Sequence, residues 1–115
     1  MSISRRTAFR LRSIVCSEVA QFDVHRLGDR LIIDCQSDLL GQLDSRLVAP
    51  LVPVSVAPTI AQRLNPVFEI DGETYVMLTQ AASAVRRREL GAVIGSFAER
   101  AFEITGALDV LISGV

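Results

Sequence analysis

The residues that most constrain how this chain folds are Asp71 and Gly72, which separate two runs of β-forming residues, 67–70 and 74–79. Asp-Gly is a preferred pair for a two-residue hairpin turn, because both central positions of that turn need a positive φ. The two runs are therefore predicted to be neighbouring antiparallel strands. This is the clearest local signal in the sequence.

A second hairpin is predicted over residues 21–35. Phe22 and Val24 alternate with polar neighbours, which is the period-two pattern of a half-buried strand. Residues 27–29 (Leu-Gly-Asp) form a short turn, and the apolar run after them is the second strand. In this pattern the side chain of His25 is expected to point to solvent or to a partner.

Turn formers and prolines follow the second hairpin. Ser37 and Asp38 are typical turn or cap residues. Residues 47–56 are rich in β-branched side chains but contain Pro50 and Pro53, and proline has no N–H to donate to a strand ladder. This segment is therefore predicted to be an edge strand or two short pieces.

The end of the chain has the pattern of an amphipathic helix. Ser96 and Glu99 form the Ser-x-x-Glu capping box, in which each side chain pairs a free backbone donor of the first turn. Apolar residues then recur at spacings of four and three, which predicts a helix of about four turns. They are Phe97, Ala101, Ile104, Leu108 and Leu111. Several strands followed by one closing helix predict an α+β or mainly β domain, such as a small β-barrel.

The first eighteen residues differ in composition from the rest. They hold four arginines, of which Arg10 and Arg12 interrupt the apolar stretch that an export signal needs. Residues 1–18 are predicted to be either a disordered arm or the product of a mis-assigned start, with the true start at Val19. Residues 19–115 are predicted to form one domain, since their number supports a single core.

The charge distribution argues against a general nucleic-acid binder. Residues 19–115 hold eight arginines against twelve acidic residues, whereas phosphate binding relies on concentrated positive charge. The one basic cluster, Arg86–Arg88, is interpreted as a solvated loop. Half of the residues are hydrophobic and the mean hydropathy is +0.38, which indicates a surface partly hidden in an oligomer or a partner interface.

The sequence offers little material for catalysis or metal binding. It has one histidine, His25, and two distant cysteines, Cys16 and Cys35, which do not make a metal site. So few cysteines predict a reducing, cytoplasmic compartment, with Cys35 as a small buried residue. Three nearby carboxylates are interpreted as turn caps: Asp34, Asp38 and Asp44. We expect no catalytic residue, metal or cofactor, because neither a nucleophile elbow nor a phosphate-binding glycine loop is present. A binding protein is favoured.

Six stretches together resemble the CcdB family, the toxin components of plasmid and chromosomal toxin–antitoxin modules. In sequence order they are QFDVHR, DCQSDLL, SRLVAPL, VFEIDGETYVMLTQ, RRREL and SFAERAFEITGALDVLISGV. The resemblance covers residues 20–115. It implies a small SH3-like β-barrel with a C-terminal α-helix, forming a homodimer.

The resemblance also implies a function. Members of the family bind the A subunit of DNA gyrase and trap that enzyme on cleaved DNA, and they are not enzymes themselves. A cognate antitoxin of the CcdA type wraps the toxin dimer with a disordered C-terminal segment, neutralises it and helps to repress their operon. Such a protein contacts DNA only indirectly, through the antitoxin complex, and needs neither a membrane nor a cofactor.

Carried over by position, the gyrase contacts lie at the end of the closing helix and directly after the QSD motif. They are Asp109, Ile112, Ser113, Gly114 and Val115, together with Leu39 and Leu40. The best-studied type of member carries tryptophan at the position of Ser113, and others carry a small hydroxyl residue there. The RLGDR turn at residues 26–30 is shorter than the corresponding loop of the family. Read without the resemblance, Gly114 is an ordinary helix C-cap and Val115 packs back on the helix.

Two alternatives to a gyrase poison remain open at this point. A related toxin family with the same fold consists of endoribonucleases, and here only His25 with the Arg86–Arg88 cluster could supply an acid–base pair and a basic groove. The acidic balance of residues 19–115 disfavours that activity. The other alternative is a decayed toxin that retains antitoxin binding only.

Overall fold

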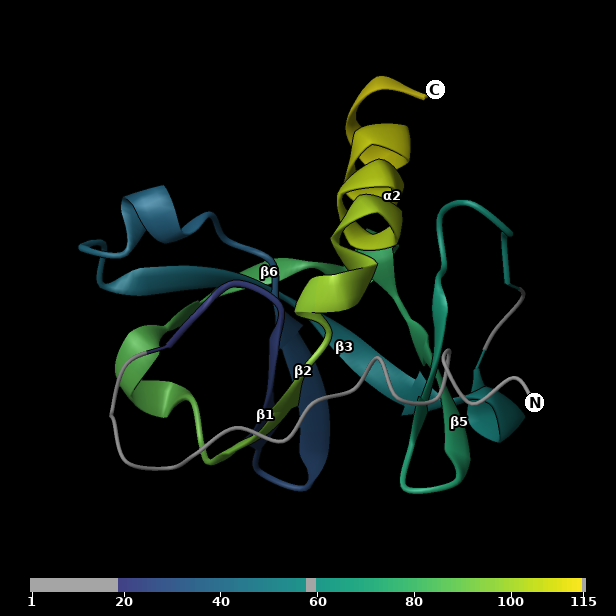
Figure 1. The fold of residues 1–115 in the computed structure, drawn as a ribbon, viewed down its shortest axis with the longest axis horizontal. Coiled ribbons are helices and arrows are strands. Elements are labelled where there is room, and N and C mark those ends of the chain that lie inside the picture. The colour runs from purple at the N-terminus through teal and green to yellow at the C-terminus, as the bar shows by residue number, and fades with distance from the viewer. Residues whose placement is uncertain (1–18, 58–59, 115) are drawn as a thin grey trace.

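The computed structural model describes residues 19–57 and 60–114. Within these residues one antiparallel sheet curls into a half-barrel, and a single α-helix, α2, follows it (Figure 1). The strands are β1 (Asp23–Leu27), β2 (Arg30–Asp34), β3 (Ser45–Pro53), β4 (Val67–Ile70), β5 (Glu73–Met77), β6 (Ser83–Arg86) and β7 (Val93–Ser96). The predicted α+β class is confirmed. The barrel is open, with β4 and β7 at the two ends of the strand order β4-β5-β3-β2-β1-β7, and β6 pairs with β3. The prediction for residues 1–18 lies outside the described residues.

Both predicted hairpins are confirmed. Asp71 and Gly72 have φ values of 53° and 82°, the positive values that the tight turn between β4 and β5 requires. Between β1 and β2, Gly28 has a φ of 64°, and Leu27 pairs with Arg30 across the turn.

Strand β3 corrects the prediction of an edge strand or two short pieces. It runs without a break from Ser45 to Pro53, and it pairs with β2 along one side and with β6 and then β5 along the other. The carbonyl of Pro50 accepts a hydrogen bond from the backbone N–H of Leu78 at 2.9 Å. The nitrogen of Pro50 faces the same side, opposite the segment between the end of β5 at Met77 and the start of β6 at Ser83, so no ladder bond is lost. Pro53 lies beyond Leu51, the last residue of β3 that β2 pairs.

The predicted helix start is also corrected. Ser96 ends strand β7, where it pairs with Asp23, and the next residue donates its N–H to the carbonyl of Phe22 at 2.9 Å. Because the sheet holds this backbone, the helix cannot begin there. The side chain of Ser96 instead accepts from the N–H of Ala98 at 3.1 Å, the first residue of the 3₁₀ turn η5 (Ala98–Arg100). The helix α2 begins after it and spans Ala101–Ser113.

One core joins the sheet to the first half of α2. Ile104 and Ala107 are fully buried, and the ring of Phe97 lies 4.4 Å from that of Phe68 on β4. Most of the predicted apolar stripe therefore faces the core. Leu111 does not, because the last turns of α2 project beyond the sheet (Figure 1) and leave it 43% exposed. The buried cluster comprises Phe22, Val24, Ile33, Cys35, Ala49, Leu51, Phe68, Ile70, Met77, Phe97 and Ile104.

Candidate functional site

The C-terminal end of α2 is an exposed, partly apolar tip. Ile112 is 82% exposed, and Asp109, Ser113 and Gly114 are exposed beside it. The hydroxyl of Ser113 donates to the carbonyl of Asp109 at 2.7 Å, so it is already paired within the helix. Gly114 has a φ of 79° and donates its N–H to the carbonyl of Val110 at 2.9 Å, which is the geometry of a left-handed helix cap. Val115 lies outside the described residues.

The second predicted contact lies in the loop of residues 36–44, between β2 and β3. This loop contains the 3₁₀ turn η1 (Asp38–Leu40). The hydroxyl of Ser37 caps η1 by accepting a hydrogen bond from the N–H of Leu39 at 3.1 Å. The prediction that Ser37 acts as a cap is confirmed. The turn has no buried residue, and Leu39 and Leu40 are 93% and 52% exposed. The loop therefore presents large apolar side chains to solvent.

A buried ion pair anchors this loop to the sheet. Arg46 on β3 donates from Nε to Oδ2 of Asp34 on β2 at 2.8 Å, and neither side chain is exposed. Arg46 also donates from Nη2 to the carbonyl of Gln36 at 3.2 Å, and its guanidinium lies 4.0 Å from the carboxylate of Asp38. Asp34 was interpreted as a turn cap, and its second oxygen does accept from the N–H of Gln36. Its partnership with Arg46 was not anticipated.

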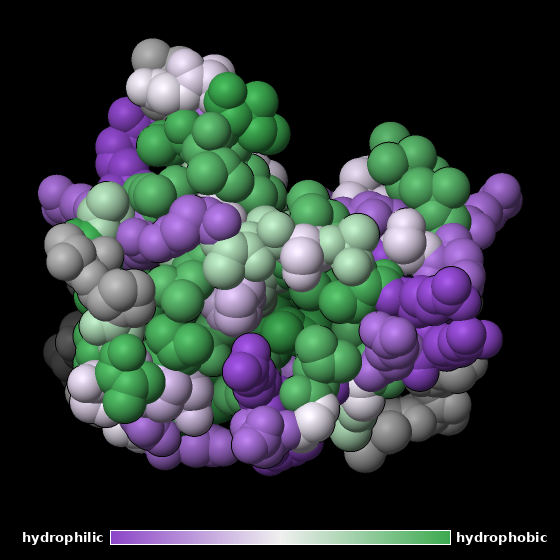
Figure 2. Space-filling view, turned by 180° about the vertical axis from the view of Figure 1, so that it is seen from behind, coloured by the Kyte–Doolittle hydropathy of each residue, from purple (hydrophilic) through white to green (hydrophobic). Residues whose placement is uncertain are grey.

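The helix tip and the 36–44 loop project from the same side of the half-barrel but stand apart. Figure 1 shows α2 and the loop rising from the sheet at separate places, and Figure 2 shows two raised green regions with lower surface between them. A single chain therefore does not assemble its predicted contact residues into one patch. A partner that used both would have to span the gap between them.

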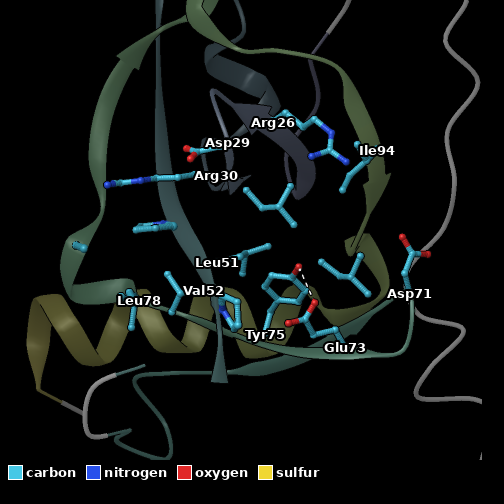
Figure 3. Close-up of a pocket in the computed structure, with 15 residues that line it drawn as sticks. Arg26, Asp29, Arg30, Leu51, Val52, Asp71, Glu73, Tyr75, Leu78 and Ile94 are labelled. Carbon is cyan, nitrogen blue, oxygen red and sulfur yellow. Dashed lines mark hydrogen bonds between the residues drawn. The ribbon is translucent and has the colours of Figure 1, made fainter. Parts of the chain in front are cut away.

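A cavity of about 690 Å³ opens on the inner face of the half-barrel, between the β1–β2 turn and the β4–β5 hairpin (Figure 3). Its apolar floor includes Leu31, Leu51 and Ile94, and its rim carries the charged side chains Arg26, Asp29, Arg30, Asp71 and Glu73. The hydroxyl of Tyr75 donates to Glu73 at 3.3 Å. Partial burial and the Glu73 carboxylate raise the pKa of Tyr75, so it stays neutral. Sequence reasoning missed this cavity because its lining comes from segments far apart in the chain.

Residues 21–114 match the sequence model of a family described as CcdB protein. The chain belongs to the CcdB family. The match spans nearly all of the residues that the structure describes, and the curled sheet with one C-terminal helix agrees with the CcdB fold. Membership makes this chain a toxin of the toxin–antitoxin type. The predicted resemblance is confirmed.

The one histidine that an endoribonuclease alternative for this CcdB-family chain would need is buried. His25 was expected to face solvent or a partner, but it is only 1% exposed. Its strand lies between β2 and β7, a bulge shifts the register at Val24 and His25, and ring nitrogen Nδ1 lies 3.1 Å from the carbonyl of Gly91. A ring enclosed in this way is not accessible to a substrate. Arg87 of the basic cluster is half-buried and donates to the carbonyl of Gly41.

The described residues of this CcdB-family chain offer neither a reactive thiol nor a metal site. Cys35 is buried as predicted, and burial raises the pKa of its thiol to about 12, so it is not a nucleophile at neutral pH. In the described part of the chain, no group of three or more His, Cys, Asp and Glu side chains could hold a metal ion. None of the helices described there is long and apolar enough to cross a membrane.

Proposed function

We propose that this CcdB-family toxin binds the A subunit of DNA gyrase and traps the gyrase complex with cleaved DNA. A cognate antitoxin of the CcdA type neutralises it in the cytoplasm and joins it in repressing their operon. The toxin acts by binding, without a cofactor or catalysis of its own. The observation that carries this proposal is the pair of exposed apolar projections, Leu39 and Leu40 on the loop and Ile112 on the helix tip.

The energetic argument rests on how exposed these side chains are. Transferring an isoleucine or leucine side chain from water into an interface contributes about 1.5–3 kcal/mol. Ile112 and Leu39 are 82% and 93% exposed, so nearly all of that contribution is available to a partner. Exposed apolar residues clustered on projections are typical of protein interaction sites rather than of solvent-facing surface.

A homodimer fits the same proposal. An isologous pair of chains would present two helix tips and two loops related by a two-fold axis, and gyrase is a symmetric target for such an arrangement. It could also bring the tip of one chain next to the loop of its partner, which a single chain does not do (Figure 2).

The test uses purified toxin, gyrase and supercoiled plasmid, with trapped linear DNA as the readout. Ile112→Ser is expected to weaken trapping about 10-fold or more, the loss of one apolar contact. Val56→Ser is the matched control, because Val56 is 72% exposed on the 3₁₀ turn η2 (Val54–Val56), outside both projections. Deleting Gly114 and Val115 is expected to abolish trapping while antitoxin binding persists. Ser113→Trp is expected to strengthen gyrase binding by adding an aromatic anchor.

The same experiment separates the alternatives. An RNA sample incubated in parallel reports ribonuclease activity, and RNA cleavage without trapped DNA would contradict the proposal. Antitoxin binding without any effect on gyrase would identify a decayed toxin instead.

A further inference from the structure

The side chain of Gln36 links the sheet to the exposed apolar turn. Its Oε1 accepts from the backbone N–H of Leu47 on β3 at 3.1 Å, and its Nε2 donates to the carbonyl of Leu40 at 3.2 Å. The side chain thus bridges the start of strand β3 and the end of η1. Only an amide side chain supplies one acceptor and one donor at its tip in this arrangement, since a carboxylate is acceptor-only when ionised.

The backbone of Gln36 is held as firmly as its side chain. Its N–H donates to Oδ1 of Asp34 at 3.0 Å, and its carbonyl accepts from Nη2 of Arg46 at 3.2 Å. Asp34 and Arg46 are fully buried and paired with each other. Gln36 therefore connects a buried ion pair to a turn that has no buried residue of its own, beside the longer contact of 4.0 Å between Arg46 and Asp38.

Hydrogen bonds leave this turn little freedom to collapse. The N–H of Leu40 donates to the carbonyl of Ser37 at 3.0 Å, that of Leu43 donates to the carbonyl of Leu40 at 3.1 Å, and Oδ1 of Asp38 accepts from the N–H of Gln21 at 2.8 Å. Exposed leucines would otherwise lower their free energy by folding back on the protein surface. A partner that receives them in a fixed position avoids the cost of ordering them on binding.

We propose that Gln36 is a positioning residue for partner binding, which holds Leu39 and Leu40 in the conformation that gyrase receives. This inference rests on the proposed function. Gln36 does not need to touch gyrase. Its contribution is to connect the turn to β3, so that the two leucines are presented before the partner arrives.

The decisive variant is Gln36→Glu. It keeps the size of the side chain and the acceptor for the N–H of Leu47, but it loses the donor to the carbonyl of Leu40. The matched control is Gln42→Glu, the same substitution with the same change of charge in the same loop, at an exposed residue. Leu39→Ser removes the presented side chain itself and shows whether the loop contacts the partner at all.

The measurements are the affinity of the full-length toxin for gyrase, the enthalpy and entropy of that binding, and amide hydrogen exchange in residues 38–43. Gln36→Glu is expected to weaken binding about 10-fold, the value of one lost hydrogen bond, whereas Gln42→Glu should stay within about 2-fold. The binding entropy of Gln36→Glu should be less favourable, and exchange in residues 38–43 should be faster at unchanged melting temperature. A change in overall stability alone would not produce that combination.

Two failures can be told apart. Equal affinities of Gln36→Glu and Gln42→Glu, with Leu39→Ser clearly weaker, would overturn the positioning role and leave the proposed function intact. If the unaltered toxin does not bind gyrase, or if Leu39→Ser binds as well as it does, the loop is not a gyrase contact and the inference is overturned with it.

Discussion

Breaking the buried pair of Asp34 and Arg46 should be among the most damaging single changes in this protein. Both side chains are fully buried, and the described structure gives the guanidinium only one close carboxylate, at 2.8 Å, with Asp38 at 4.0 Å. Arg46→Met leaves the Asp34 carboxylate buried with one backbone donor, the N–H of Gln36. Removing one partner of such a pair costs about 3–5 kcal/mol, because a charge remains uncompensated away from water.

The assay is urea unfolding at one fixed protein concentration for the wild type, Asp34→Asn, Arg46→Met and the double variant. Each single change is expected to lower the free energy of unfolding by about 3–5 kcal/mol, and a separate thermal melt should show a Tm lower by about 12 °C or more. The double variant should cost much less than the sum, since neither charge is then left alone. Glu103→Gln is the control, because it breaks a pair with Arg100 in which the Glu103 side chain is 54% exposed, and surface pairs of this kind contribute at most about 1 kcal/mol.

Two results would refute this reasoning. Additive effects in the double variant would show that the two charges do not compensate each other. A loss below about 1 kcal/mol for either single variant would show that water reaches the pair and that the site is not the low-dielectric anchor described above.

Further predictions concern Cys35 and two glycines, Gly106 and Gly91. In a Cys16→Ser background, Cys35 should resist iodoacetamide in the folded protein and react in guanidinium, as measured by intact mass. Because burial raises its pKa from 9.0 to about 12, the unfolded thiol ionises first, so the free energy of unfolding should fall as the pH rises from about 9 to 12. Gly106→Ala should raise the free energy of unfolding by about 1 kcal/mol, since an added Cβ on α2 meets no atom within 4 Å. Gly91→Ala should lower it by about 1–3 kcal/mol, because its Cβ would lie 2.7 Å from the backbone oxygen of Arg26; equal melting temperatures for the two glycine variants would contradict this contrast.

Features encoded over a few neighbouring residues could be predicted from the sequence. The turn at Asp71 and Gly72 needs only two residues with positive φ, and the structure has both. The helix and its buried face at Ile104 follow from a spacing that repeats within one element. Such signals do not depend on what other parts of the chain do.

The predictions were wrong where residues far away in the chain determine the local structure or the burial of a side chain. Pro50 is tolerated in a paired strand because it lies opposite the segment between the end of β5 and the start of β6, which no local pattern reveals. Ser96 was read as a helix cap, but pairing with Asp23 keeps it in the sheet. His25 is buried beside the carbonyl of Gly91, which is 66 residues away in the chain, so its alternation with polar neighbours could not reveal its surroundings.

The candidate site likewise contains residues that could be predicted from the sequence and residues that could not. The exposed leucine pair and the helix tip were predicted through the family resemblance, and the structure leaves both accessible. The residues that hold the loop were not predicted, since Arg46 reads in sequence as one more charged residue at the start of a strand. A buried arginine becomes evident only when its carboxylate partner, twelve residues away, is seen beside it.

The free end of α2 also has an electrical character. A helix C-terminus carries the equivalent of about half a negative charge from its aligned peptide dipoles, and basic side chains nearby usually offset it. The last turn of α2 has no basic residue, and Asp109 adds a full negative charge close to that end. A protein surface that receives this tip must therefore bring N–H donors or cationic side chains to meet it. Mobile salt ions screen the attraction between them beyond about 8 Å at physiological ionic strength, so it guides the last approach rather than the distant encounter.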